Sequence, residues 1–132
     1  MMAYTSVLAR ARAAAERLMA DECVVRRRTG VVTDPDTGQT TPTYATVYAG
    51  RCRVQQRGPS ARSAEAGEAH VLMQRLEVHV PVSVSEVAVG DEVTITASTH
   101  DPDLVGRTFL VRELAHKSLA SARRLGVEER TA

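Results

Sequence analysis

Aromatic residues are scarce in this sequence. There is no tryptophan, and aromatic residues make up 3% of the 132 positions, so the interior must be built mainly from valine, leucine and alanine. A small domain of this kind buries little apolar surface per residue, and association with copies of itself would add to that burial. The scarcity also argues against a single-stranded nucleic-acid barrel, which stacks bases on aromatic side chains.

Excess charge and long apolar runs are also absent. The 17 Lys and Arg residues against 16 Asp and Glu residues give a formal net charge of +1, which argues against a protein held on nucleic acid by bulk charge. No apolar run approaches the roughly 20 residues of a membrane-spanning helix, and the first residues lack the apolar block of a secretory signal. The sequence therefore predicts one soluble domain.

Signals of catalysis are weak. The two cysteines, Cys23 and Cys52, are expected to be buried free thiols rather than a disulfide or a metal site. The histidines are scattered, and no phosphate loop or nucleophile elbow is visible. We expect no enzyme, no cofactor and no metal. One alternative of another class stays open, a metal-dependent hydrolase using His100, Asp101 and Asp103, although turns use the same residue types.

A β pattern dominates what is present. From Val89 to Glu129 the chain alternates apolar and polar residues, with Val93 and Ile95 on one face of a strand that follows a Gly-Asp turn. Phe109 and Val111 share a face of the next strand, and residues 119–129 predict a weaker third. This stretch is the best-specified folding unit of the chain.

The N-terminal 20 residues predict a helix. Apolar side chains recur there at helical spacing and indicate an amphipathic helix of about four turns, capped by Thr5 or Ser6. Its apolar stripe either covers the β domain, the commoner case, or binds a neighbouring subunit, and one stripe can do both. Tyr4, Leu8 and Leu18 are the candidate interface residues.

Residues 22–56 predict a long hairpin. Its strands, 22–33 and 41–56, flank the turn Asp34-Pro35-Asp36-Thr37-Gly38, in which Pro fixes φ and Gly tolerates positive φ. Asp36 at the projecting tip is a further candidate interface residue. The row Arg26-Arg27-Arg28 on the first arm is interpreted as solvated or inter-subunit positions, with phosphate contact a minority option. On the second arm, one parity places these residues on one face: Tyr44, Thr46, Tyr48, Cys52 and Val54.

Residues 57–70 predict a flexible loop, because this Gly-, Pro-, Ser- and Ala-rich segment has too little apolar surface to order itself. Residues 71–81 then predict a strand. The expected single domain, 1–132, thus comprises a helix (1–20), a long hairpin (22–56), the loop (57–70) and the remaining β core (71–129). The fold class is mainly β: a small barrel or sandwich with one N-terminal α-helix and a long projecting hairpin.

The order of these elements resembles the small head-tail joining proteins of long-tailed bacteriophages, and most of all the head-closure (stopper) proteins of actinobacterial phages. The resemblance extends less sharply over the whole chain, and no single motif in it is diagnostic. It is carried by Gly90, Asp91, Val93, Pro102, Leu104, Gly106, Arg107, Phe109, Val111, Ser118, Arg123, Arg124, Leu125 and Glu128.

The resemblance implies a structural virion protein without catalytic activity. Such proteins form a ring, of six or twelve copies, that joins the portal-adaptor complex to the tail and helps to retain packaged DNA. The implied partners are further copies of the chain, the adaptor or connector protein of the head, the tail terminator or tail tube, and DNA in the lumen without sequence specificity. The implied location is the virion neck, and the host cytoplasm during assembly.

The same resemblance assigns a role to the loop. In head-closure proteins the corresponding segment points into the ring channel, so Arg57 and Arg62 are expected to face DNA phosphates. A plain surface loop is the alternative interpretation. Within the virion class, a tail terminator or another neck or tail structural protein is the runner-up.

Overall fold

The computed structural model describes residues 3–56 and 76–130. In this part of the chain one helix precedes six strands. The elements are α1 (Ala3–Arg17), β1 (Asp21–Thr33), β2 (Thr40–Gln56), β3 (Leu76–Val80), β4 (Glu92–Ser98), the short 3-10 helix η1 (Pro102–Leu104), β5 (Thr108–Ala115) and β6 (Arg123–Glu129).

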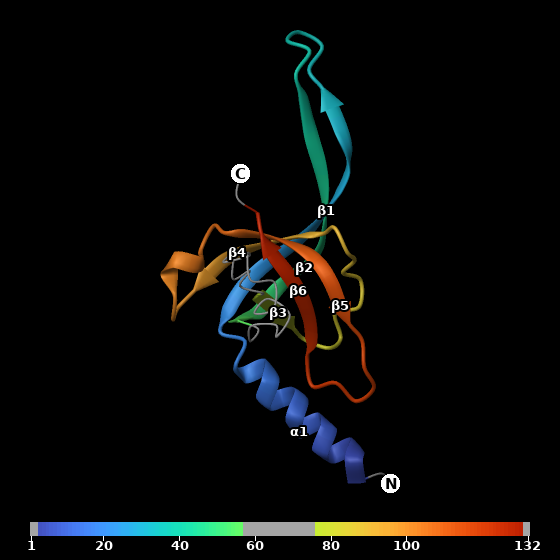
Figure 1. Cartoon of the computed structure of the whole chain (residues 1–132), viewed down its shortest axis with the longest axis vertical. Helices are drawn as coiled ribbons and strands as arrows, with labels where there is room; N and C mark the ends of the chain where they lie inside the picture. Colours follow the sequence, from blue (N-terminus) through green and yellow to red (C-terminus); the bar gives the residue numbers. More distant parts are fainter. Residues whose placement is uncertain (1–2, 57–75, 131–132) are drawn as a thin grey trace, which may run out of the picture.

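The six strands form one antiparallel sheet that closes on itself in the order β1-β2-β3-β6-β5-β4. Closure pairs β1 with both β2 and β4, so no strand is left as an edge within the barrel. The prediction of a mainly β fold with one N-terminal helix and a projecting hairpin is confirmed (Figure 1).

The barrel interior is built from the residues that the alternating pattern selects. Val93 and Ile95 on β4, and Phe109 and Val111 on β5, are all 0% exposed. Valine dominates because β-branched side chains pack well on a pleated surface. The whole core cluster consists of Cys23, Val25, Cys52, Val78, Val80, Val87, Val93, Ile95, Phe109, Val111, Leu125 and Val127.

The hairpin β1–β2 extends far beyond the barrel. β1 pairs with β4 only over Asp21–Arg26, and β2 pairs with β3 only over Arg53–Gln56, whereas β1 and β2 pair with each other as far as Thr33 and Thr40. The outer half is therefore a two-stranded ribbon with solvent on both faces (Figure 1). A ribbon of two strands has little stability of its own.

The prediction that Tyr44 and Tyr48 share one face of β2 is wrong. The pairing register shifts between Val25 and Arg26, so that Val47 becomes an extra residue on β2. Such a bulge reverses the inward and outward sense of the residues that follow it. Tyr48 therefore lies opposite the core residue Val25, while Tyr44 lies opposite Arg28 on the outer face. The bulge marks the point where the ribbon enters the barrel.

The helix lies at the end of the molecule opposite the hairpin tip (Figure 1). It already begins at Ala3, so the expected cap at Thr5 or Ser6 is wrong; both residues lie inside the first turns. The last strand is also shorter than expected, because Leu119 adopts a left-handed φ of 58° that a strand does not accommodate, and β6 begins at Arg123.

Candidate interaction surfaces

The tip of the hairpin is a well-defined acidic turn. The Asp34 carboxylate accepts a hydrogen bond from the Asp36 amide at 2.9 Å, and the Gly38 amide donates to the Asp34 carbonyl at 2.8 Å. Gly38 has φ +74°, a conformation that side chains with a Cβ rarely adopt. These bonds fix the turn and leave the Asp36 side chain exposed, as the sequence predicted for an interface residue.

The root of the hairpin is fixed to the barrel by Arg27. Its guanidinium binds both oxygens of Asp91, with Nε 2.9 Å from Oδ1 and a terminal nitrogen 3.0 Å from Oδ2, and donates to the Glu86 carbonyl at 2.7 Å. Asp91 is 2% exposed and also accepts from the Ala88 amide at 2.8 Å. The carboxylate raises the pKa of Arg27 through this hydrogen bond and its charge.

Arg26 occupies the other face of the root, over the ring of Tyr44 at 3.8 Å from the ring centroid. It pairs at 3.1 Å with Glu92, whose side chain is 8% exposed, and Arg130 pairs with the other oxygen of the same carboxylate. With Thr108 these four residues line a recess of about 310 Å³, named the root pocket below. Arg26 and Arg27 are therefore not free cations, because both bind carboxylates of their own chain, although 40% and 47% of their side chains stay exposed. Whether they also contact another subunit stays a prediction. Arg28 is exposed and has no acidic partner among the described residues.

Below the root, the barrel wall is tightly packed around Tyr48. Its hydroxyl donates to the Arg51 carbonyl at 2.7 Å, and its ring covers Gly50, where a Cβ would lie 2.7 Å from the hydroxyl oxygen. Burial is the main cause that raises the pKa of Tyr48 to about 12. Cys23 and Cys52 lie nearby as free, buried thiols, as expected, and their mutual hydrogen bond together with burial raises the pKa of Cys52.

The helix presents an apolar stripe to solvent. Tyr4 and Val7 are 54% and 62% exposed, and Leu18, just past the end of α1, is 57% exposed. Their spacings of three and eleven residues, about one and three helical turns, place them on one side. The side next to this stripe faces the chain: Leu8 is half-buried, and the Arg12 guanidinium donates to the Ala120 carbonyl at 3.0 Å. Of the three helix residues predicted for an interface, two are thus free to bind a partner.

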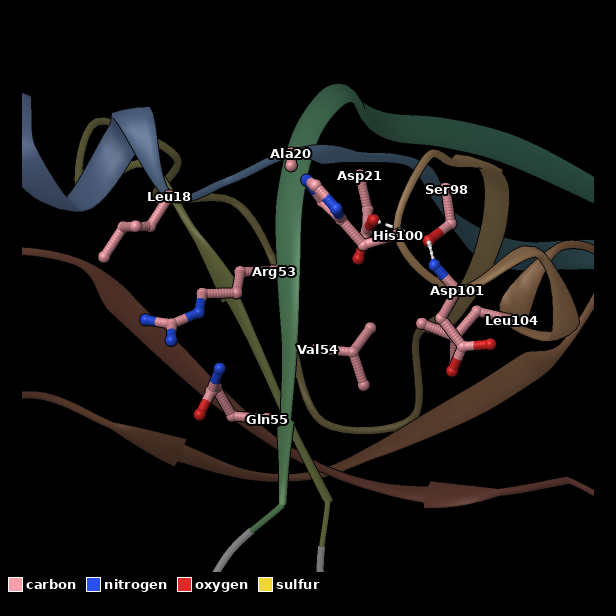
Figure 2. A pocket seen from close by; sticks show the side chains of 10 residues that line it. All are labelled: Leu18, Ala20, Asp21, Arg53, Val54, Gln55, Ser98, His100, Asp101 and Leu104. Atoms are coloured by element: carbon pink, nitrogen blue, oxygen red, sulfur yellow. Dashed lines mark hydrogen bonds between the residues drawn. The ribbon is translucent and has the colours of Figure 1, made fainter.

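A recess of about 240 Å³ opens beside Leu18, between the end of the helix and the barrel (Figure 2). Within it the Ser98 hydroxyl donates to the Asp21 carboxylate at 2.7 Å and accepts from the Asp101 amide at 3.2 Å. The hydroxyl proton is already engaged by a carboxylate, and no histidine of the described chain is hydrogen-bonded to it. The network holds the turn after β4 and lacks the nucleophile–base pair of a hydrolase. The lining is completed by Ala20, Arg53, Val54, Gln55, His100 and Leu104.

Two of the three residues of the hydrolase alternative, Asp101 and Asp103, have structural roles in this turn, and the third, His100, lines the recess. The Asp101 carboxylate accepts from the Asp103 amide and caps η1, and the Asp103 carboxylate pairs with Arg107 at 2.8 Å. Across residues 3–56 and 76–130, no three His, Cys, Asp or Glu side chains are grouped so that they could hold a metal ion. Nothing in this arrangement favours the metal-dependent alternative.

The predicted channel loop lies outside the described residues. Arg57 and Arg62 both belong to it, so their expected contact with DNA stays a prediction.

Neither the root pocket nor the Arg27–Asp91 pair was predicted from the sequence. Each joins residues 38–66 positions apart, and a single sequence contains no signal for partners at such separations. One local cue was available, because Asp91 follows a turn glycine and precedes a strand with an acidic residue at its first position. A carboxylate entering a buried strand there requires a basic partner.

Together these features define a class: a small closed β-barrel with a two-stranded ribbon, acidic at its tip, at one end and a helix with an exposed apolar stripe at the other. The chain belongs to DUF6093, a family of unknown function, whose profile matches residues 11–128. No helix of the described chain is both long and apolar enough to cross a membrane.

The fold also occurs in a solved structure. The solution structure of protein SF1141 from Shigella flexneri 2a is similar, with a TM-score of 0.56 over 84% of this chain and 92% of that chain. At 11% sequence identity this likeness concerns the fold alone. The sequence has no significant match among curated proteins.

Proposed function

We propose that this protein is a structural subunit of the neck of a long-tailed bacteriophage, a head-closure protein that forms a ring between the portal-adaptor complex and the tail. The observation that supports this most strongly is the placement of the two elements with the least packing of their own. The ribbon and the helix extend from opposite ends of a well-packed barrel (Figure 1), as expected for a subunit that contacts neighbours on two sides.

Exposed apolar side chains on both elements add to this support. Val31 and Val32 on the ribbon are 53% and 57% exposed, and the helix stripe is similarly open. Exposed apolar side chains gathered on one side, as on the helix, indicate a binding face. Val31 and Val32 are consecutive strand residues, so each face of the ribbon presents one of them. The acidic tip and the root pocket supply charged groups at the ribbon. In an assembly these charges would give specificity, and the exposed apolar side chains would give contact area.

The mechanism in this proposal is mechanical. The barrel fixes the shape of the subunit, the helix and ribbon bind neighbours, and the segment containing Arg57 and Arg62 faces the channel and its DNA. A ring repeats each weak phosphate contact around the lumen without making the free protein basic. A tail terminator, the runner-up, would use the same surfaces at the tail side of the neck.

The test is complementation of a phage that lacks the gene. The double variant Val7→Asp with Leu18→Asp places charges on the exposed stripe, where no core contact is lost, so the protein should fold normally by circular dichroism. We expect filled heads without tails and loss of the protein from purified particles. Ser6→Asp, an exposed neighbour off the stripe, is the matched control and should complement.

Two outcomes would contradict the proposal. One is full complementation by the double variant, which would remove the helix from assembly. The other is absence of the unaltered protein from the neck of purified particles, detected with an antibody and negative-stain microscopy.

A further inference from the structure

From the root pocket we infer a binding site for carboxylate side chains, and we propose that it receives the acidic hairpin tip, Asp34 and Asp36, of a second copy of this chain. The inference rests on the proposed function in one respect, that copies stand side by side in an assembly.

The pocket holds unused positive charge. Two guanidinium groups, Arg26 and Arg130, share the single carboxylate of Glu92. Each guanidinium has five N–H donors. Glu92 takes up two nitrogens of Arg26 and one of Arg130, and the described residues offer the others no further acceptor. Terminal N–H groups of both arginines therefore remain available at the mouth of the recess.

The pocket is also pre-organised. Arg26 is held between the ring of Tyr44 and the buried Glu92 carboxylate, and its side chain is 40% exposed. A fixed guanidinium loses little conformational entropy when it binds a carboxylate in bidentate fashion. Charge-assisted hydrogen bonds of this kind are among the stronger polar contacts.

The tip supplies the matching charge. Asp34 and Asp36 are exposed, lie two residues apart in a turn fixed by its own hydrogen bonds, and have no cationic partner among the described residues. A carboxylate pair on a projecting element and a basic recess with free donors are complementary. Arg28, exposed on the same arm as the pocket, adds to the attraction.

The distance between the hairpin tip and the root pocket decides whether the tip binds its own copy or a neighbouring one. The chain is extended from Arg26 to Thr33, the end of β1, and then enters the turn that carries Asp34 and Asp36. At roughly 3.3 Å per residue the tip and the pocket of one copy are therefore about 25 Å apart. The tip therefore does not reach its own pocket. A domain of about 100 residues has a radius of gyration near 13 Å and is about 33 Å across, so a neighbour displaced by one domain width places its pocket at this tip. Repetition of that head-to-tail contact closes a ring if the rotation from one copy to the next divides a full turn, as the ring of the proposed function requires.

The first experiment measures self-association of the full chain by sedimentation velocity across a concentration series. Asp34→Asn with Asp36→Asn, and separately Arg130→Gln, should each weaken association about tenfold, as the loss of about 1.4 kcal/mol implies. Glu22→Gln and Arg17→Gln, exposed charges away from the tip and pocket, should leave it unchanged. The inference would be overturned if the tip and pocket variants self-associated as strongly as the unaltered chain does.

The second experiment locates the contact in assembled particles. Arg130→Lys places an amine in the pocket, and a zero-length carbodiimide should then join Lys at this position to Asp34 or Asp36, identified by mass spectrometry. Mixed light and heavy isotope labels should show that the bond joins two copies, and the same reagent should link that lysine to Glu92 within one copy as an internal control.

These readouts separate the two proposals. Particles that contain the protein but yield only the Glu92 link would overturn the tip-and-pocket contact while leaving the neck assignment intact. Loss of binding to a short DNA duplex in Arg130→Gln, with self-association of the tip variant unchanged, would assign the pocket to phosphate and also overturn the inference.

Discussion

The ribbon continues two of the six barrel strands, β1 and β2, yet the barrel and ribbon parts of these strands differ sharply in burial. Inside the barrel, Val25 of β1 and Cys52 of β2 are fully buried, whereas from Arg27 to Pro42 every side chain is exposed. Across this boundary β1 and β2 stay paired as antiparallel strands, and only their register shifts at the bulge. Hydrogen bonding therefore sets the shape of both regions, but only the barrel gains the burial that makes a fold stable.

This difference teaches where function should be sought. A region that contributes little to its own stability and extends into solvent is the first place to look for a binding role. The Val47 bulge and the Arg27–Asp91 pair lie at the boundary, where the ribbon joins the barrel.

The largest contrast should appear when one apolar side chain is removed from each region. Phe109→Ala empties the centre of the barrel and should lower the free energy of unfolding by about 3–5 kcal/mol. Val31→Ala, on the ribbon and 53% exposed, should change it by less than about 0.5 kcal/mol. Urea unfolding followed by circular dichroism measures both. Comparable losses would mean that the ribbon is part of the folding core.

The ion pair at the boundary should have an intermediate effect. Asp91→Ala leaves the Ala88 amide and Arg27 without their acceptor, and should cost about 1–3 kcal/mol. Asp103→Ala removes the same residue type from an exposed pair with Arg107 and should cost about 0.5 kcal/mol or less. Chemical denaturation of the two variants in parallel gives the difference, and a larger loss for Asp103→Ala would contradict this view of the root.

A methyl group added in the barrel part of the hairpin should lower stability more than a methyl group added in the ribbon. Gly50→Ala forces the Tyr48 ring to move and should cost about 1–2 kcal/mol. Gly30→Ala, on the ribbon, meets nothing closer than the Thr43 hydroxyl at 3.7 Å and should be nearly neutral. Thermal melts of both proteins provide the measurement; a neutral Gly50→Ala would show that the barrel wall yields more easily than its packing indicates.

The smallest effect concerns the titration of Tyr48. Burial raises its pKa to about 12, above the ordinary value near 10, so the fold favours the neutral phenol. The stability that Tyr48 contributes is complete below about pH 10 and is lost as the pH rises through about 12. Absorbance at alkaline pH should show one tyrosine that ionises near pH 12, and Tyr48→Phe should abolish that step. Its persistence in Tyr48→Phe would assign it to another residue.

Much of this architecture follows from local sequence patterns. The hairpin arms were expected at 22–33 and 41–56 and run from Asp21 to Thr33 and from Thr40 to Gln56, because alternation and a Pro-Asp-Thr-Gly turn are both encoded within a few residues. The same holds for the strand around Ile95 and for the described part of the strand ending at Val80.

Features set by distant parts of the chain could not be predicted in this way. The bulge at Val47 depends on how the ribbon twists into a closed barrel, and the partners of Arg26 and Arg27 come from β4 and the loop before it. Of the interface candidates, Tyr4, Leu18 and Asp36 are exposed while Leu8 is half-buried, because periodicity identifies an apolar stripe without saying which part of it the chain itself covers.

Hydrogen–deuterium exchange tests most directly the claim that the barrel carries stability and the ribbon and helix carry assembly. In the dilute free protein, amides of β4 and β5 should exchange with the free energy of global unfolding, while those of residues 29–43 and of α1 should exchange orders of magnitude faster. In assembled particles the ribbon and helix amides should become slow. Equal protection of the ribbon and the barrel in the free protein would contradict the account.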